Sequence, residues 1–155
     1  MCYYTAMEFS LEDLSQIARD IIQKEQDKKS PDHATLITLS GDLGAGKTTL
    51  VQEIARQLGV EQALQSPTFV IYKVYPLRRP AADPLPWKTL VHGEMYRLQS
   101  PEEMQLLGWE ALLADPENII CIEWPEKIEG IIPKWASQIT LKHGEGIDKR
   151  GIDIV

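Results

Sequence analysis

The stretch GDLGAGKTT, from Gly41 to Thr49, decides the fold of this chain. Its first eight residues fit the pattern G-x-x-x-x-G-K-[ST], which brings three glycines, a lysine and a hydroxyl into one short loop. The preceding residues 34–39 are apolar and β-branched, and they predict a strand. Apolar residues at helical spacing follow the loop and end near Gly59, as expected for a helix. A loop between a strand and a helix is typical of a phosphate site, whereas a plain glycine-rich turn needs neither neighbour.

The loop has the groups that a nucleoside triphosphate requires. Its backbone N–H groups can converge on phosphate oxygens without side chains in the way. Residues 41–48 would supply them, and these include Gly41, Asp42, Leu43, Gly44, Ala45 and Gly46. Lys47 would reach the β- and γ-phosphates, and the Thr48 hydroxyl would bind the Mg²⁺ that bridges them. We expect the Thr49 hydroxyl to contact the α-phosphate, so the sequence predicts a site for Mg²⁺ and a nucleotide.

Hydrolysis needs further groups, and two stretches after the loop offer them. In Ser66–Phe69, Thr68 is a candidate to contact the γ-phosphate or the metal; the alternative is an ordinary turn before a strand. In His92–Arg97, the sequence HGEMYR ends a strand, and Glu94 is a candidate to hold a metal-bound water. The alternative for Glu94 is a surface ion pair.

A third candidate stretch ends the apolar run of residues 118–122. Glu123 closes this run, at the position where P-loop enzymes carry a second acidic residue, and Trp124 follows it. Glu123 is a candidate metal ligand, and Trp124 is either part of the nucleotide site or plain core. Arg97 and Arg150 are candidates for transition-state charge, but neither makes a convincing arginine finger, and Arg97 is expected to brace the HGEMYR segment.

The remaining pattern predicts an α/β fold. Ser10 followed by Asp13 resembles an N-cap, and residues 11–22 have helical spacing. One or two helices are expected in residues 101–113. In addition to residues 34–39, strands are predicted at residues 3–9, 69–75, 89–92, 118–123, 138–141 and 151–154. This order predicts a P-loop NTPase three-layer sandwich with a mostly parallel central sheet and antiparallel C-terminal strands.

Composition limits the class of protein. A chain of 155 residues that is 43% hydrophobic suits one domain, residues 1–155, with a proline-rich excursion at Pro76–Lys88. The net charge of −7 argues against a broad nucleic-acid or membrane surface, so we expect no DNA partner and contact with RNA only through other proteins. Cys2 and Cys121 are too few for a disulfide framework. With no apolar run near membrane-spanning length and no leader pattern, we expect a cytoplasmic protein that does not bind a membrane.

Several motifs in the same order resemble the TsaE (YjeE) family of small bacterial ATPases. They are GDLGAGKTTLV, SPTF, HGEMYRL and IEWPEKI, followed by Pro133 and Arg150. The similarity runs over most of residues 10–154. It implies an ATPase that uses ATP and Mg²⁺ and works with the TsaD and TsaB proteins to make the threonylcarbamoyl adenosine modification of tRNA.

The resemblance also implies roles for residues. The family's phosphate loop corresponds to residues 41–49, its switch-like threonine to Thr68, and its essential glutamate and tryptophan to Glu123 and Trp124. Its H-x-D-x-Y-R aspartate, thought to serve the magnesium and the attacking water, corresponds to Glu94, which is one methylene longer. The first helix departs as well, with Leu14 and Ala18 where the family tends to have threonine and glycine.

Our sequence-based hypothesis is an ATPase in which Lys47, Thr68, Glu94 and Glu123 are catalytic, with Thr48, Glu94 and Glu123 around the metal. Two other functions fit the same loop. One is a nucleotide switch that does not hydrolyse ATP. The other is a small-molecule kinase, which would need an arginine-rich lid, and the paired arginines outside the motifs are Arg78 and Arg79.

Overall fold

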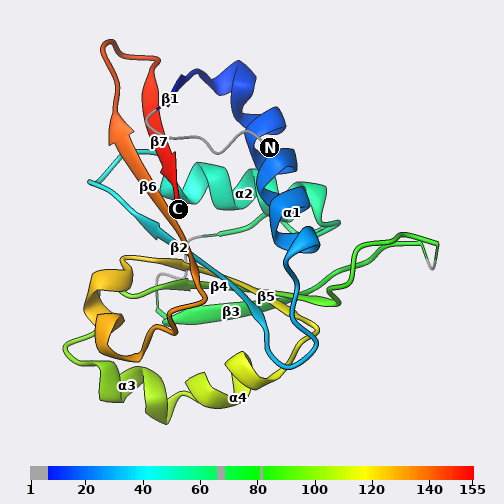
Figure 1. Ribbon diagram of the computed structural model, residues 1–155. Coiled ribbons are helices and arrows are strands. Elements are labelled where there is room, and N and C mark those ends of the chain that lie inside the picture. The colour runs from blue at the N-terminus through cyan, green and yellow to red at the C-terminus, as the bar shows by residue number, and fades with distance from the viewer. Residues whose placement is uncertain (1–6, 66–68, 81) are drawn as a thin grey trace.

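The computed structural model describes residues 7–65, 69–80 and 82–155, and within them it shows one mixed sheet with helices on both faces (Figure 1). The strands are β1 (Met7–Phe9), β2 (Thr35–Ser40), β3 (Tyr72–Pro76), β4 (Thr89–Glu94), β5 (Asn118–Glu123), β6 (Ser137–His143) and β7 (Arg150–Ile154). The α-helices are α1 (Leu14–Asp27), α2 (Lys47–Gln57), α3 (Pro101–Leu106) and α4 (Trp109–Ala114). Two 3₁₀ segments, η1 (Leu11–Asp13) and η2 (Pro125–Ile131), complete the described elements.

The sheet has seven strands in the order β1-β7-β6-β2-β5-β4-β3. Its centre is parallel, because β2 pairs in parallel with both β5 and β6, and β4 pairs in parallel with β5. The C-terminal strand β7 is antiparallel to β6 and to β1. At the other edge, β3 is antiparallel to β4. The expected α/β class, with a parallel centre and antiparallel C-terminal strands, is confirmed, and the antiparallel edge strand β3 adds to it.

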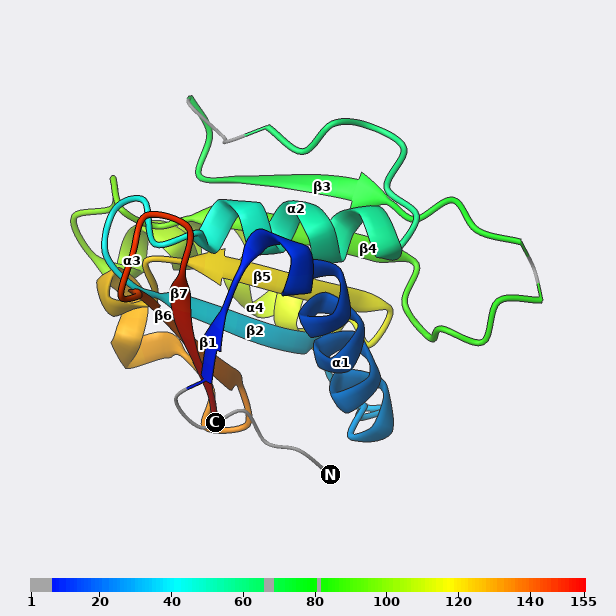
Figure 2. The same ribbon diagram turned by 90° about the horizontal axis from the view of Figure 1, so that it is seen from above.

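Helices cover both faces of the sheet (Figures 1 and 2). One apolar core lies between the sheet and helices α1 and α2, and it includes Ile21, Leu50 and Ile54. A second core lies on the opposite face under α3, α4 and η2, and it includes Met104 and Trp109. Three layers result, as predicted. Among the described residues, no helix combines the length and the apolar character needed to cross a membrane.

The helix ends follow local sequence signals. The Ser10 N–H and hydroxyl both donate to Asp13 Oδ2, at 2.8 and 2.9 Å, as the N-cap pattern predicted. Helix α1 continues to Asp27, beyond the last residue of the apolar pattern. Between α3 and α4, Gly108 has a φ of 86°, which ends the first helix and separates the predicted stretch into two.

Two expectations need correction or restriction. The strand predicted at residues 69–75 begins only at Tyr72, which pairs with Gly93. The antiparallel partner β4 ends one residue after Gly93, at Glu94, so it offers no further residues to pair with Phe69 and Val70. Phe69 is instead 94% exposed. Of the strand predicted at residues 3–9, the described part is β1, and residues 3–6 lie outside the described residues. The 3₁₀ segment η2 was not predicted, because its apolar residues have no regular period.

The proline-rich excursion extends away from the sheet (Figures 1 and 2) but is attached at its base. Arg79 forms an ion pair with Asp83 at 3.0 Å. The Trp87 side chain is 1% exposed, and its indole N–H donates to Thr35 Oγ1 at 2.8 Å. Pro76, which we assigned to the excursion, is the last residue of β3, where an edge strand tolerates proline.

Candidate functional site

The glycine-rich loop runs from the end of β2 to the first turn of α2, as the sequence predicted. Gly41 has a φ of 143°, and a Cβ at this position would lie 2.3 Å from the backbone oxygen of Leu141 in β6. Gly46 has a φ of 103° directly before α2. Only glycine combines this close backbone approach with these dihedral angles, so the loop lies flat against the sheet with its N–H groups at the helix N-terminus.

Lys47 points back into its own loop. Its Nζ donates to the carbonyl oxygens of Gly41, at 2.6 Å, and Asp42, at 3.0 Å, and lies 4.1 Å from the centre of the Trp124 ring. Burial lowers the pKa of Lys47, and nearby carboxylates oppose this shift, Glu123 most strongly. Because these carbonyls are neutral acceptors, an anionic phosphate would bind the ammonium more strongly than they do.

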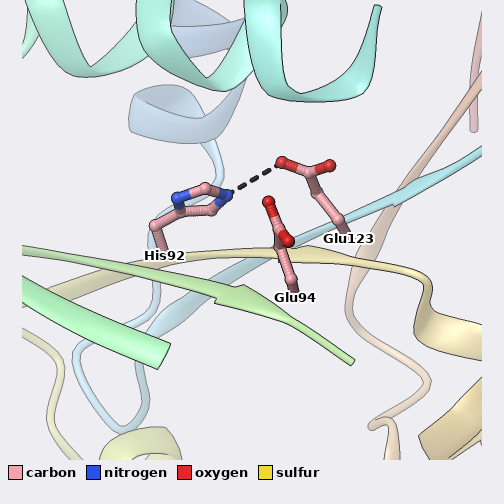
Figure 3. A group of neighbouring side chains, drawn as sticks. All are labelled: His92, Glu94 and Glu123. Carbon is pink, nitrogen blue, oxygen red and sulfur yellow. Dashed lines mark hydrogen bonds and ion pairs between the residues drawn. The ribbon is translucent and has the colours of Figure 1, made fainter. Parts of the chain in front are cut away.

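Three side chains converge at the carboxyl ends of β4 and β5 (Figure 3). Glu94 and Glu123 are register partners at the ends of these parallel strands, and His92 lies two residues before Glu94 on the same face of β4. One nitrogen or oxygen from each residue lies within 4.8 Å of the others. All three are buried, with exposed fractions of 0%, 8% and 2% for His92, Glu94 and Glu123.

Glu123 connects this cluster to the loop. Its Oε2 accepts the Thr48 hydroxyl at 2.9 Å, and its Oε1 lies 2.8 Å from His92 Nε2. Thr48, Glu94 and Glu123 together present hydroxyl and carboxylate oxygens, which is the donor set that Mg²⁺ prefers. The residues therefore fit a magnesium ion, and Glu94 is buried beside Glu123 rather than on the open surface.

Trp124 follows Glu123 in an unusual backbone conformation. Its φ of 59° and ψ of 51° lie in the left-handed region, which non-glycine residues rarely adopt. The turn ends β5 before Pro125, and it lays the indole along the cleft and over Lys47. Trp124 also packs against the core under α3 and α4 as a half-buried residue. Trp124 therefore both lines the cleft and packs against this core, and its part in a nucleotide site stays a prediction.

A cleft of about 440 Å³ opens over these groups. It is lined by Leu43, Gly44, Gly46, Lys47, Thr48, Thr49, Glu94, Tyr96, Glu123 and Trp124. A second hollow of about 220 Å³ shares Gly44, Gly46 and Thr49 with it. The rest of its lining comes from Phe9, Leu11, Ile147, Asp148 and Arg150. The loop thus has one hollow with buried carboxylates and another with apolar walls.

Most of the predicted site residues meet here. Ala45 is fully buried beneath the loop, and Asp42 contributes its carbonyl to Lys47. Thr68 lies outside the described residues. Arg97 is exposed and packs over the ring of its neighbour Tyr96, with 5.2 Å between the guanidinium carbon and the ring centre.

Sequence reasoning missed the part of His92 and the wall formed by Phe9 and Ile147. Alternation along β4 was the available signal for His92, because residues two apart on a strand share a face. No local signal pairs Phe9 with Ile147, which lie at opposite ends of the chain.

Comparison with known proteins gives consistent matches. Residues 9–152 match the family described as threonylcarbamoyl adenosine biosynthesis protein TsaE. A TsaE protein of Haemophilus influenzae is 30% identical over 152 residues, which cover 98% of this chain and 87% of that protein. One from Streptomyces coelicolor is 45% identical over 96 residues, 61% of this chain and 60% of that protein. The crystal structure of Bacillus subtilus YdiB superposes with a TM-score of 0.61 at 25% identity, covering 97% of this chain and 86% of that one.

Proposed function

The chain belongs to the TsaE family, with a role in the biosynthesis of threonylcarbamoyl adenosine in tRNA, and from this membership we propose that it is the ATP-hydrolysing subunit of that process. In this proposal hydrolysis depends on Mg²⁺ and is slow until TsaD and TsaB proteins bind. The chain acts in the cytoplasm as a single domain, and it meets tRNA only through these partners.

One observation carries the proposal, namely the connection of Lys47, Thr48 and Glu123 around one cleft. Lys47 would exchange its two carbonyl partners for phosphate oxygens. The Thr48 hydroxyl donates a hydrogen bond to Glu123, so its oxygen lone pairs are available to a metal ion. Bound Mg²⁺ would neutralise charge on the β- and γ-phosphates.

Glu94 is the residue we assign to the attacking water. Its carboxylate ends β4 beside Glu123 and lines the same cleft. Burial in the cleft limits competing solvent, and a carboxylate there can accept a hydrogen bond from a water aimed at the γ-phosphate. We also assign Thr68 a contact with the γ-phosphate, and this assignment rests on the sequence alone.

The second hollow suits the nucleoside. It lies across the loop from the carboxylates and has apolar walls from Phe9, Leu11 and Ile147. A flat purine base gains by leaving water against such walls. ATP would then span the loop, with its base in this hollow and its γ-phosphate in the larger cleft.

The arginines of the described chain support activation by a partner. Arg97 packs on Tyr96, and Arg150 Nη1 donates to the carbonyl oxygens of Ile147 and Lys149. Both guanidinium groups are thus engaged by their own neighbourhood. Charge that develops on the γ-phosphate in the transition state would be met by a group from another chain.

The position of Arg78 and Arg79 disfavours the kinase. The Arg78 N–H donates to Gly59 O at 3.3 Å, so this pair lies at the C-terminal end of α2. The phosphate loop lies at the other end of this 11-residue helix, about 16 Å away at 1.5 Å per residue. A lid over the phosphates would need arginines at the N-terminal end.

The test is phosphate release from Mg²⁺–ATP by this protein alone, by TsaD and TsaB alone, and by the mixture, with Lys47→Ala as a control. Turnover that arises mainly in the mixture and disappears with Lys47→Ala is expected. Turnover by the chain alone, unchanged by partners, would contradict activation. Full tRNA modification over many turnovers with a non-hydrolysable ATP analogue would favour the switch.

A further inference from the structure

His92 is the residue in the site that the proposed function leaves without a task. It is fully buried, it lies on β4 between β5 and the edge strand β3, and its Nε2 lies 2.8 Å from Glu123 Oε1. Burying a polar ring costs free energy unless the ring is hydrogen-bonded. The same face of β4 carries an aliphatic residue two positions earlier, the buried Leu90. A buried polar ring at such a site needs a contact that an aliphatic residue cannot make.

The hydrogen bond has a defined direction. An ionised carboxylate only accepts, so the proton of this contact is on His92 Nε2. Among the described residues, His92 Nδ1 is buried and has no hydrogen-bond partner. A bare lone pair is cheaper to leave there than an unpaired N–H, so the geometry assigns the N–H to Nε2 rather than to Nδ1.

This direction gives Glu123 two donors on two different oxygens. His92 donates to Oε1 and Thr48 donates to Oε2 at 2.9 Å. A carboxylate with one donor can rotate about its terminal torsion, and a second donor on the other oxygen removes this freedom. The three residues come from β4, β5 and α2, so the contact also joins two strands to the loop's helix.

We propose that His92 is a positioning residue: it holds Glu123 so that Glu123 accepts the hydrogen bond of the Thr48 hydroxyl, which turns the Thr48 lone pairs toward a divalent cation. The inference rests on the proposed function, because it assumes that a cation joins the nucleotide at Thr48. His92 itself touches neither nucleotide nor metal. Partners of this kind, one contact behind a metal ligand, change metal affinity or activity by about 10- to 100-fold when they are removed.

The test compares ATP affinity with Mg²⁺ and with a chelator, measured by titration calorimetry. His92→Leu removes the donor, and His92→Gln keeps an N–H donor. Cys121→Ala is the matched packing control, because Cys121 is the register partner of His92 and equally buried. In His92→Leu we expect the gain in affinity from Mg²⁺ to fall about tenfold or more, with Mg²⁺-free affinity within about twofold of wild type. His92→Gln should restore most of the gain, and Cys121→Ala should keep it.

The other possible results separate failure of the proposed function from failure of the inference about His92. If wild type gains no affinity from Mg²⁺, the proposed function fails together with this inference. If wild type gains and His92→Leu gains equally, only the inference fails. An equal loss in Mg²⁺-free affinity would mean that His92 is merely structural. Mn²⁺ binding to nucleotide-free wild type that His92→Gln abolishes would make His92 a direct ligand instead.

A second measurement needs neither nucleotide nor metal. The chain has three histidines, so ¹⁵N spectra of the nucleotide-free protein can be assigned with the His92→Gln variant. We expect His92 to have its proton on Nε2. A proton on Nδ1 would contradict the direction of the hydrogen bond and with it the inference.

Discussion

Two carboxylates of this protein, Glu25 and Glu123, are equally buried, each 2% exposed, yet their surroundings differ. Glu25 in α1 accepts the Ser137 hydroxyl at 2.6 Å and has the Lys28 ammonium 3.2 Å away. In the described part of the chain, Glu123 has His92 and Thr48 as donors and forms no ion pair with a lysine or arginine. Glu123 also lines the cleft above the phosphate loop.

The difference separates a structural carboxylate from a functional one. A buried charge is tolerated when an opposite charge is already beside it, as at Glu25. At Glu123 the hydrogen-bond donors are dipoles, Lys47 interacts with it only electrostatically, and Glu94 adds a second carboxylate within the same cluster. The site therefore has negative charge to offer to an incoming cation, while the Glu25 network is complete.

The largest expected effect comes from replacing the lysine near each carboxylate, Lys47 near Glu123 and Lys28 near Glu25, with alanine. Lys47→Ala should lower ATP affinity and turnover by about 10²- to 10³-fold, because a preorganised donor for phosphate is lost. Lys28→Ala, in the other network, should leave both unchanged. Calorimetric ATP titration and partner-stimulated phosphate release measure the two effects. Equal losses in both variants would erase the distinction between the networks.

Replacing the carboxylates themselves should separate activity from stability. Glu123→Gln should lower Mg²⁺-dependent turnover by about 10- to 100-fold. Glu25→Gln should leave turnover per folded molecule unchanged and lower the free energy of unfolding by about 2 kcal/mol, since a hydrogen-bonded charge is lost. Urea denaturation and phosphate release serve as the measurements. The comparison breaks if Glu25→Gln slows turnover while its folded fraction is normal.

A smaller effect is expected for Glu94→Asp, which installs the shorter acid of the related motif. The Glu94 carboxylate lies beside Glu123. Replacing Glu94 with the shorter aspartate moves the carboxylate oxygens back from the cleft by about the length of one C–C bond. We expect turnover to fall about tenfold, because small misplacements of about 1 Å are costly in such sites. Glu126→Asp, an exposed neighbour after β5, is the control. Faster turnover in Glu94→Asp would show that the site is shaped for aspartate.

The smallest effect concerns a surface pair, which is a third environment for a carboxylate. The Arg56 guanidinium, with Gln57, lowers the pKa of Glu53 from 4.5 to about 2. A depressed folded-state pKa stabilises the protein above pH 4.5, and this stabilisation is lost as the pH falls toward 2. Glu53→Gln should therefore cost about 1 kcal/mol at pH 7, limited by the exposure of Arg56, and nothing near pH 2. Melting temperatures over this range test it, and a constant difference at all pH values would contradict it.

Local sequence was sufficient where neighbours in the chain make the feature. The loop at residues 41–49, its flanking strand and helix, and the N-cap at Ser10 all depend on contacts within a few residues. The same holds for Glu123 at the end of an apolar run, because the end of a buried parallel strand is readable from its composition.

Contacts between distant segments could not be read this way. The pairing of Glu94 with Glu123 depends on β4 lying beside β5, and the bond from His92 depends on that register. The left-handed turn at Trp124 likewise has no signal in its own residue type. Sequence spacing thus supplied the phosphate loop and the candidate acids. Their assembly into one cluster needed the folded sheet, because strand order and register are set by packing between residues far apart in the chain.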